Sequence, residues 1–266
     1  ISGRFAHTRR NRPSRESFRL RIPYQKKEWE GNPLLIFSKE LVQTFLYVKR
    51  EKRILLYIAY ISAGLNFLIM PLYIIGVPYL EKEIFHVTNQ MYGISEACIG
   101  IGVIVGALIV GIWGKYFSIE KIHYLLIGLA IVIFGMGASI FPVIFMESEI
   151  NFISFFLLTV TGFLFTVCIT ISSIICTTFI QKESPEAMMG KIISLVNAFG
   201  TIFLPLGQVF FGIIYGWLKE KSFWLYAMVG LFTIAESYII KKIINKNEKE
   251  VAINEKHEST EHENGE

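Results

Sequence analysis

Long apolar runs alternate with short polar segments along most of this chain. Six runs carry almost no charged side chain, and they cover about residues 54–76, 95–113, 122–145, 152–180, 192–217 and 222–240. A helix needs about 20 apolar residues to cross a bilayer core of roughly 30 Å. Because a backbone in lipid must satisfy its own hydrogen bonds, we expect each run to form a membrane-spanning helix.

Composition supports a protein that is embedded in a membrane. Hydrophobic residues make up 53% of the 266 residues and charged residues only 18%, whereas a typical soluble domain has about 25% charged residues. The expected fold class is therefore an all-α membrane protein with six transmembrane helices, in contact with the lipid bilayer. We expect residues 1–53 to form a basic cytoplasmic segment, residues 54–240 the transmembrane domain, and residues 241–266 a disordered cytoplasmic tail.

The distribution of Lys and Arg predicts the orientation of the spans. Basic residues are concentrated before residue 54, in the loops after the second and fourth runs, and after residue 240. Lys219 and Lys221, in the turn before the sixth run, are exceptions. This pattern predicts a multi-pass protein of the cell (plasma) membrane with both termini in the cytoplasm. The net charge of +4 is then a topology signal, and we expect no nucleic-acid partner.

Several kinds of chemistry are not supported by the sequence. The chain has no Asp, and its five His residues lie in tails, in loops or at the edge of an apolar run. The three Cys residues stand singly in apolar runs, without the spacing of a metal site. A phosphate-binding loop of the G-x-x-x-x-G-K-[ST] type is also absent. We therefore expect neither an enzyme nor a bound cofactor or metal.

Polar residues follow one face of several predicted helices. In the fourth run, small and hydroxyl residues recur every three or four positions from Thr159 to Thr177, which places them on one helix face. The first and fifth runs carry primary amides, which are costly to place against lipid. We expect a substrate pathway walled by the first, fourth and fifth runs, with the third and sixth facing lipid. Its candidate residues are Asn66, Thr166, Thr170, Ser173, Asn197, Thr201 and Gln208. The alternative is that these polar residues only pack helices together.

Glycine pairs and two carboxylates are further features of the runs. Gly102–Gly106 and Gly212–Gly216 have the G-x-x-x-G spacing that lets helices approach closely. Glu96, at the outer end of the second run, is the candidate coupling carboxylate; the alternative is a carboxylate at headgroup level. Glu236 lies near the cytoplasmic end of the sixth run, and we expect it to extend towards the membrane surface.

A short charged loop, "QKESPEAMMGK" at residues 181–191, separates the fourth and fifth runs. With the helix after it, this segment resembles the region between helices ten and eleven of major facilitator superfamily exporters. "NFLIMPLYIIGVPYLEKEIFHVTNQMYGISEACIGIGVIVGALI" is similar to helices seven and eight of the macrolide-efflux and enterobactin-exporter-like branch. The residues of the loop that match are Gln181, Pro185, Glu186, Gly190 and Lys191. Lys191 stands where the family usually has Arg.

The resemblance implies a fold of twelve helices in two halves around a central cavity, of which this chain is the C-terminal half. It implies a missing N-terminal six-helix half as partner. It also implies a secondary active transporter, a proton-driven exporter of a drug-like or siderophore-like small molecule. The loop would then act as a cytoplasmic gate, formed by Gln181, Glu183, Glu186, Gly190 and Lys191.

The first 25 residues do not fit this pattern. They contain seven Arg and no Lys, whereas residues 26–266 contain 17 Lys and two Arg. We expect residues 1–25 to be a foreign or frame-shifted junction, the alternative being a natural basic arm on anionic lipid. Residues 30–53 resemble the end of the family's central loop. Two other functions stay open: a half-size, non-transporting membrane subunit or scaffold, and the membrane domain of an ATP-driven pump.

Overall fold

The computed structural model describes residues 33–51, 53–145, 152–186 and 188–263. The chain divides into two compact units, residues 1–38 and residues 39–266. Helix α1 (Pro33–Glu51) begins in the first unit, and all other described elements belong to the second. The expected junction at residues 1–25 lies outside the described residues.

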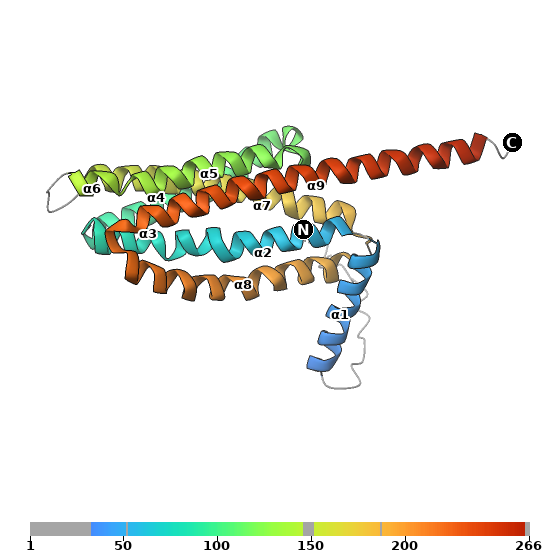
Figure 1. The fold of residues 1–266 in the computed structure, drawn as a ribbon, viewed down its shortest axis with the longest axis horizontal. Helices are drawn as coiled ribbons and strands as arrows, with labels where there is room; N and C mark the ends of the chain where they lie inside the picture. Colours follow the sequence, from blue (N-terminus) through green and yellow to red (C-terminus); the bar gives the residue numbers. More distant parts are fainter. Residues whose placement is uncertain (1–32, 52, 146–151, 187, 264–266) are drawn as a thin grey trace, which may run out of the picture. The chain divides into compact units, whose positions relative to one another are not determined.

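The described residues contain six helical segments long and apolar enough to cross a membrane, which confirms the six predicted spans (Figure 1). All described secondary structure is helical. The first span consists of α2 (Arg53–Ile74), α3 (Gly76–Tyr79) and η1 (Leu80–Ile84), and the second of α4 (Asn89–Trp113) and η2 (Gly114–Tyr116). The third consists of η3 (Ile119–Lys121), α5 (Ile122–Ala138) and the start of α6 (Phe141–Phe145). The fourth is α7 (Phe152–Glu183), the fifth is α8 (Met189–Leu218), and the sixth is the apolar part of α9 (Phe223–Glu263), which follows η4 (Lys219–Ser222).

Local signals in the sequence set several helix ends. The side chain of Thr88 caps α4 by accepting a hydrogen bond from the backbone N–H of Met91 at 3.3 Å. Pro185 follows the end of α7, where a further helical turn would lose a hydrogen bond. Pro71 lies inside α2, which ends three residues later before the short α3. The first span nevertheless continues as helix to Ile84.

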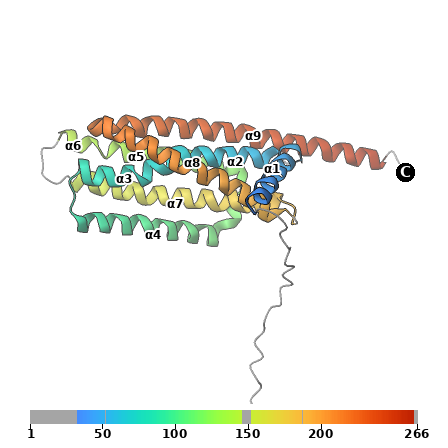
Figure 2. The ribbon, with the colours of Figure 1, turned by 90° about the horizontal axis from the view of Figure 1, so that it is seen from below.

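The spans pack in the order α4–α7–α5–α9–α2–α8, each mainly against its neighbours in this series. Figures 1 and 2 show α5 beside α9, and α4 along one face of α7. Helices α4 and α8 stand at the two ends of the series. Each of them has one extensive partner among the described residues, α7 for α4 and α2 for α8.

Glycines form the closest helix contacts, but not all those that the sequence predicts. A Cβ added at Gly106 would lie 2.9 Å from the carbonyl oxygen of Val167, so the G-x-x-x-G prediction is confirmed for α4 against α7. The described residues provide no such contact for α8, because a Cβ at Gly212 or Gly216 would meet none of their atoms within 4 Å. Helix α8 instead approaches α2 through Gly200 and Gly207.

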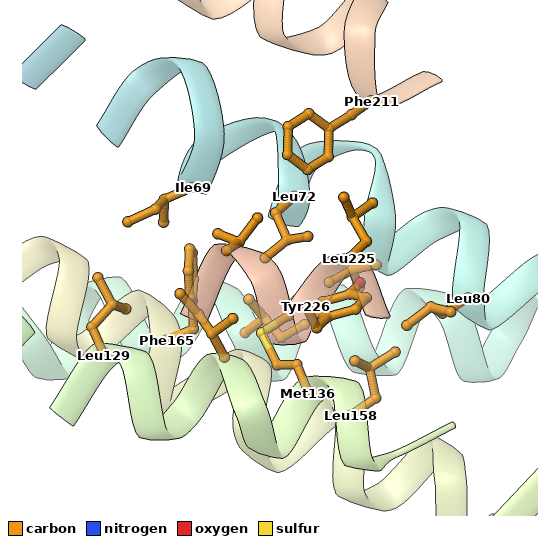
Figure 3. Packing of buried hydrophobic residues seen from close by; sticks show 14 of the residues in the cluster. Ile69, Leu72, Leu80, Leu129, Met136, Leu158, Phe165, Phe211, Leu225 and Tyr226 are labelled. Carbon is orange, nitrogen blue, oxygen red and sulfur yellow. The ribbon is translucent and has the colours of Figure 1, made fainter. Parts of the chain in front are cut away.

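The main hydrophobic core joins all six spans (Figure 3). Leu72, Leu129, Phe165, Phe211 and Tyr226 come from five different helices and are fully buried in it. A second, smaller cluster lies where α1 meets the spans, with Val48 packed near Leu55 and Ile192.

The C-terminal segment differs from the sequence prediction. We expected disorder from residue 241, but α9 continues as a helix to Glu263, and its apolar part extends to Asn245. Residues 241–263 contain neither Gly nor Pro and are rich in Lys, Glu and Ile. Most of these residues are compatible with a helix, and Lys and Glu are among its stronger formers. A charged composition alone therefore does not end this helix.

Candidate functional site

A cavity of about 600 Å³ lies inside the bundle. Helices α2 and α7 provide most of its wall, and the remainder comes from α4, η3, α5, α8 and α9. Because α5 and α9 stand between α7 and α2 in the packing order, their ends also reach the cavity, through Ile122, Leu126, Ile240 and Ile244. The third and sixth spans, which we expected to face lipid, thus also line part of the cavity, while Ile131 and Met228 on them are exposed.

Five of the seven predicted pathway residues line this cavity: Asn66, Thr166, Thr170, Ser173 and Asn197. They come from α2, α7 and α8, the three helices that the polar stripes indicated.

Thr201 and Gln208 lie outside the cavity lining. Each of them follows a glycine that packs against α2: Gly200 lies against Asn66, and Gly207 against the backbone of Phe67. Since successive residues of an α-helix are about 100° apart, Thr201 and Gln208 point away from α2. Thr201 is exposed in the structure, and Gln208 is half-buried.

Two of the lining residues also stabilise the helices around them. The hydroxyl of Thr166 donates to the carbonyl oxygen of Ile99 on α4 at 2.8 Å, and to that of Phe163 in its own helix at 2.9 Å. The side-chain nitrogen of Asn66 donates to the carbonyl oxygen of Ser62 at 2.8 Å. Thr166 therefore both lines the cavity and holds α7 against α4, so the cavity interpretation and the packing interpretation of the stripe both apply to it.

The sequence prediction missed the aromatic part of the lining. Tyr73 of α2 and Phe165 of α7 stack across the cavity wall, with ring centroids 5.4 Å apart and 24° between the ring planes. Helical spacing could have indicated Tyr73, because Ser62, Asn66, Met70 and Tyr73 follow one another at steps of four, four and three. Phe165 carries no comparable signal, since it stands among many other apolar residues.

The lining itself is largely apolar and uncharged. Its polar groups are hydroxyls, two primary amides and one thiol, and it contains no Lys, Arg, His or Glu among the described residues. Such a surface can hold an apolar molecule and form a few hydrogen bonds with it.

The candidate coupling carboxylate Glu96 lies in α4 and is half-buried. Beside it lies Glu81, which the sequence placed in a loop but which is fully buried in η1. By hydrogen-bond geometry, neither carboxylate oxygen of Glu81 has a partner among the described residues, although the hydroxyl of Ser95 lies beside the carboxyl. No local signal shows this burial, because it depends on the first span continuing past Pro71 into η1. Neither Glu81 nor Glu96 belongs to the cavity lining.

The predicted gate residues lie at the opposite ends of the helices from η1. Gln181 and Glu183 end α7, Glu186 lies in the turn, and Gly190 and Lys191 begin α8. The Nζ atom of Lys191 lies 3.3 Å from Oε1 of Glu40 in α1. These two side chains are 47% and 26% exposed, so water weakens their attraction.

Comparison with protein families gives one match, to the Major Facilitator Superfamily, over residues 10–259. Comparison with curated proteins and with solved structures gives no significant match. The family match covers nearly the whole chain and agrees with six apolar spans around a cavity. The chain therefore belongs to the Major Facilitator Superfamily, a family of secondary transporters.

Proposed function

We propose that this chain is the C-terminal six-helix half of a proton-driven exporter in the plasma membrane, with both termini in the cytoplasm. It works with an N-terminal six-helix half, and the cavity is its share of the substrate pathway. The observation that carries the proposal is the cavity of about 600 Å³ with hydroxyl and amide groups among membrane spans. A volume of this size suits a drug-sized ligand.

The lining favours one of the two substrate classes expected from the sequence. An anionic siderophore-like molecule would have to move from water into a cavity whose described lining residues carry no positive charge. Moving an unpaired charge into such surroundings is costly. We therefore propose an uncharged, largely apolar drug-like substrate that packs against Tyr73 and bonds to Asn66 or Asn197.

A transport assay with two probes tests the function and the substrate class together. The chain is reconstituted in liposomes together with a candidate N-terminal six-helix half, and a pH gradient is applied. Chloramphenicol, which is uncharged, should be transported in the direction opposite to the proton flow, and the anionic 2,3-dihydroxybenzoylserine should not. Preference for the anion would contradict the substrate class, and transport of neither would contradict the exporter.

Cysteine labelling tests whether water reaches the proposed pathway. In a chain without its three native cysteines, Asn66→Cys, Thr170→Cys and Ser173→Cys should react with a small hydrophilic thiol reagent. Leu164→Cys on α7 is the matched control, because Leu164 is exposed but outside the cavity lining, and it should stay unlabelled in lipid. Equal inertness at all four positions would show that the stripe is a packing surface.

Two exposed glutamines at opposite ends of the bundle test the orientation. Gln90 begins α4 near η1, and Gln181 ends α7 near the proposed gate. An impermeant thiol reagent added to intact cells should label Gln90→Cys and leave Gln181→Cys unlabelled. The reverse result would overturn the proposed orientation.

A further inference from the structure

The sixth membrane span carries a buried carboxylate, that of Glu236. The sixth apolar segment runs from Phe223 to Asn245, so Glu236 lies well inside it rather than one turn from its end. Its side chain is only 7% exposed. The expectation that Glu236 extends towards the membrane surface is therefore wrong.

The carboxyl group of Glu236 fits a gap in α2. A Cβ added at Gly64 would lie 2.6 Å from Oε1 of Glu236, so the absence of a side chain at Gly64 makes room for the carboxyl. Gly64 lies about halfway along α2, which places this contact deep in the bundle. The Oε2 atom is buried and has no hydrogen-bond partner.

The contact lies directly behind the cavity wall. On α2, Ser62, Leu65 and Asn66 surround Gly64 in sequence and line the cavity. On α9, Ile240 stands one helical turn beyond Glu236 and lines it as well. The carboxyl therefore lies among residues whose sequence neighbours on both helices line the cavity.

The elements packed against α9 bring little charge to this point. From Ile54 to Ile74, α2 carries no charged residue, and in α5 the one basic residue is His123. The Nδ1 atom of His123 lies 2.8 Å from the carbonyl oxygen of Glu120, and its own carbonyl oxygen accepts from Ser237 at 2.8 Å.

The remaining charged residues lie at the ends of these helices. Glu120 and Lys121 in η3, Lys221 in η4, and Lys241 and Lys242 of α9 are all exposed. Among the described residues, the carboxyl of Glu236 therefore forms no ion pair that would stabilise its charge at this depth.

We propose that Glu236 is a proton-binding residue of the transport cycle, which rests on the proton-driven function proposed above. An unpaired carboxylate in an apolar site is costly when charged. In the conformation described here Glu236 therefore carries a proton. When α2 moves and water in the cavity reaches the group, the O–H bond breaks and the proton passes to that water. One proton is bound on one side of the membrane and released on the other in each cycle.

Infrared spectroscopy of the full chain in lipid nanodiscs tests this without any substrate. A reversible change from acidic to alkaline buffer should remove the carbonyl band of protonated carboxyl groups in the wild-type chain. Glu236→Gln should lack one component of this band, and Glu236→Asp should shift that component. Glu81→Gln is the matched control, because Glu81 is a buried glutamate away from the cavity. It should leave the Glu236 component in place.

The outcomes separate this inference from the proposed function. A band that is the same in the wild type and in Glu236→Gln would overturn the role of Glu236, and so would a component that does not respond to pH. Thermal unfolding of Glu236→Gln shows whether the variant is folded, and Glu236→Asp gives a second test if it is not. In the transport assay, Glu236→Gln should lose transport driven by the pH gradient but keep exchange of chloramphenicol between the two sides. Absence of all transport in the wild type would contradict the exporter but leave the infrared result valid.

Discussion

Helices α4 and α8 differ sharply from α5 and α9 in how much of them the bundle covers. In their most apolar stretches, α4 is 17% buried and α8 22%, whereas α5 and α9 are each 44% buried. The difference follows from the packing order, which places α4 and α8 at its two ends and α5 and α9 inside it. The sequence suggested the opposite, because α5 and most of α9's span are almost purely apolar.

The comparison teaches that apolarity does not show which helix surface meets protein. Lipid tails are as apolar as Leu or Ile side chains, so an apolar helix face gains little free energy when it leaves lipid to pack against another helix. Small residues that allow close approach are the better guide, as at Gly106 and Gly207. The bundle leaves large apolar faces of α4 and α8 uncovered, which supports the proposal that another six-helix half packs against them.

The largest expected effect concerns what covers these faces. A photo-crosslinking amino acid at Ile104 of α4 or Val209 of α8, both exposed, should capture the N-terminal half when the two halves are expressed together. The same group at Ile131 of α5 or Met228 of α9, which are equally exposed, should capture only lipid. Mass spectrometry of the crosslinked products distinguishes the two. Capture of the partner only at Ile131 and Met228 would show that the other half covers α5 and α9 and leaves α4 and α8 to lipid.

A second test compares two glycines of α8. Gly207→Ala should destabilise the protein by about 1–3 kcal/mol, because the added methyl would collide with the backbone of Phe67, which cannot move aside easily. Gly212→Ala has open space and should be neutral or stabilise the helix by up to about 1 kcal/mol. Unfolding in detergent measures both. Equal losses would show that Gly212 also meets protein.

A smaller effect is expected between α5 and α9. A Cβ at Gly230 would lie 2.9 Å from the ring of Phe134. Because a side chain can move further than a backbone, we expect Gly230→Ala to cost about 1 kcal/mol, at the low end for overpacking. Gly128→Ala on α5 meets nothing within 4 Å and serves as the control. A loss at Gly230 larger than that at Gly207 would mean that the α5–α9 contact is the more rigid one.

The smallest effect concerns the hydrogen bond between α7 and α4. Thr166→Ala removes the bond to the carbonyl oxygen of Ile99, and such bonds between membrane helices contribute about 0.6 kcal/mol on average. Thr178→Ala, at an exposed position of the same helix, should have no comparable effect. The same unfolding measurement applies. A loss well above the average would make Thr166 mainly a packing residue.

The site could be predicted in part because some of its signals are local. The hydroxyl stripe of α7 repeats at helical spacing, so Thr170 and Ser173 were placed on one face without knowledge of neighbours. Thr201 and Gln208 could not be excluded in this way, because their direction depends on how Gly200 and Gly207 turn α8 towards α2. The sequence of α8 alone does not show which face of the helix packs against α2.

The sequence by itself determined the membrane class, the six spans and the break at Pro185. Each of these depends on the length of an apolar run or on one residue's backbone chemistry, which are local properties. Only the tertiary structure decided which helix faces meet, how far α9 and the first span extend, and that Glu81 and Glu236 are buried. The physical reason is that the burial of a carboxylate depends on which helices pack around it in the folded protein. In a membrane those neighbours are apolar whether they are protein or lipid, so the surrounding sequence does not reveal them.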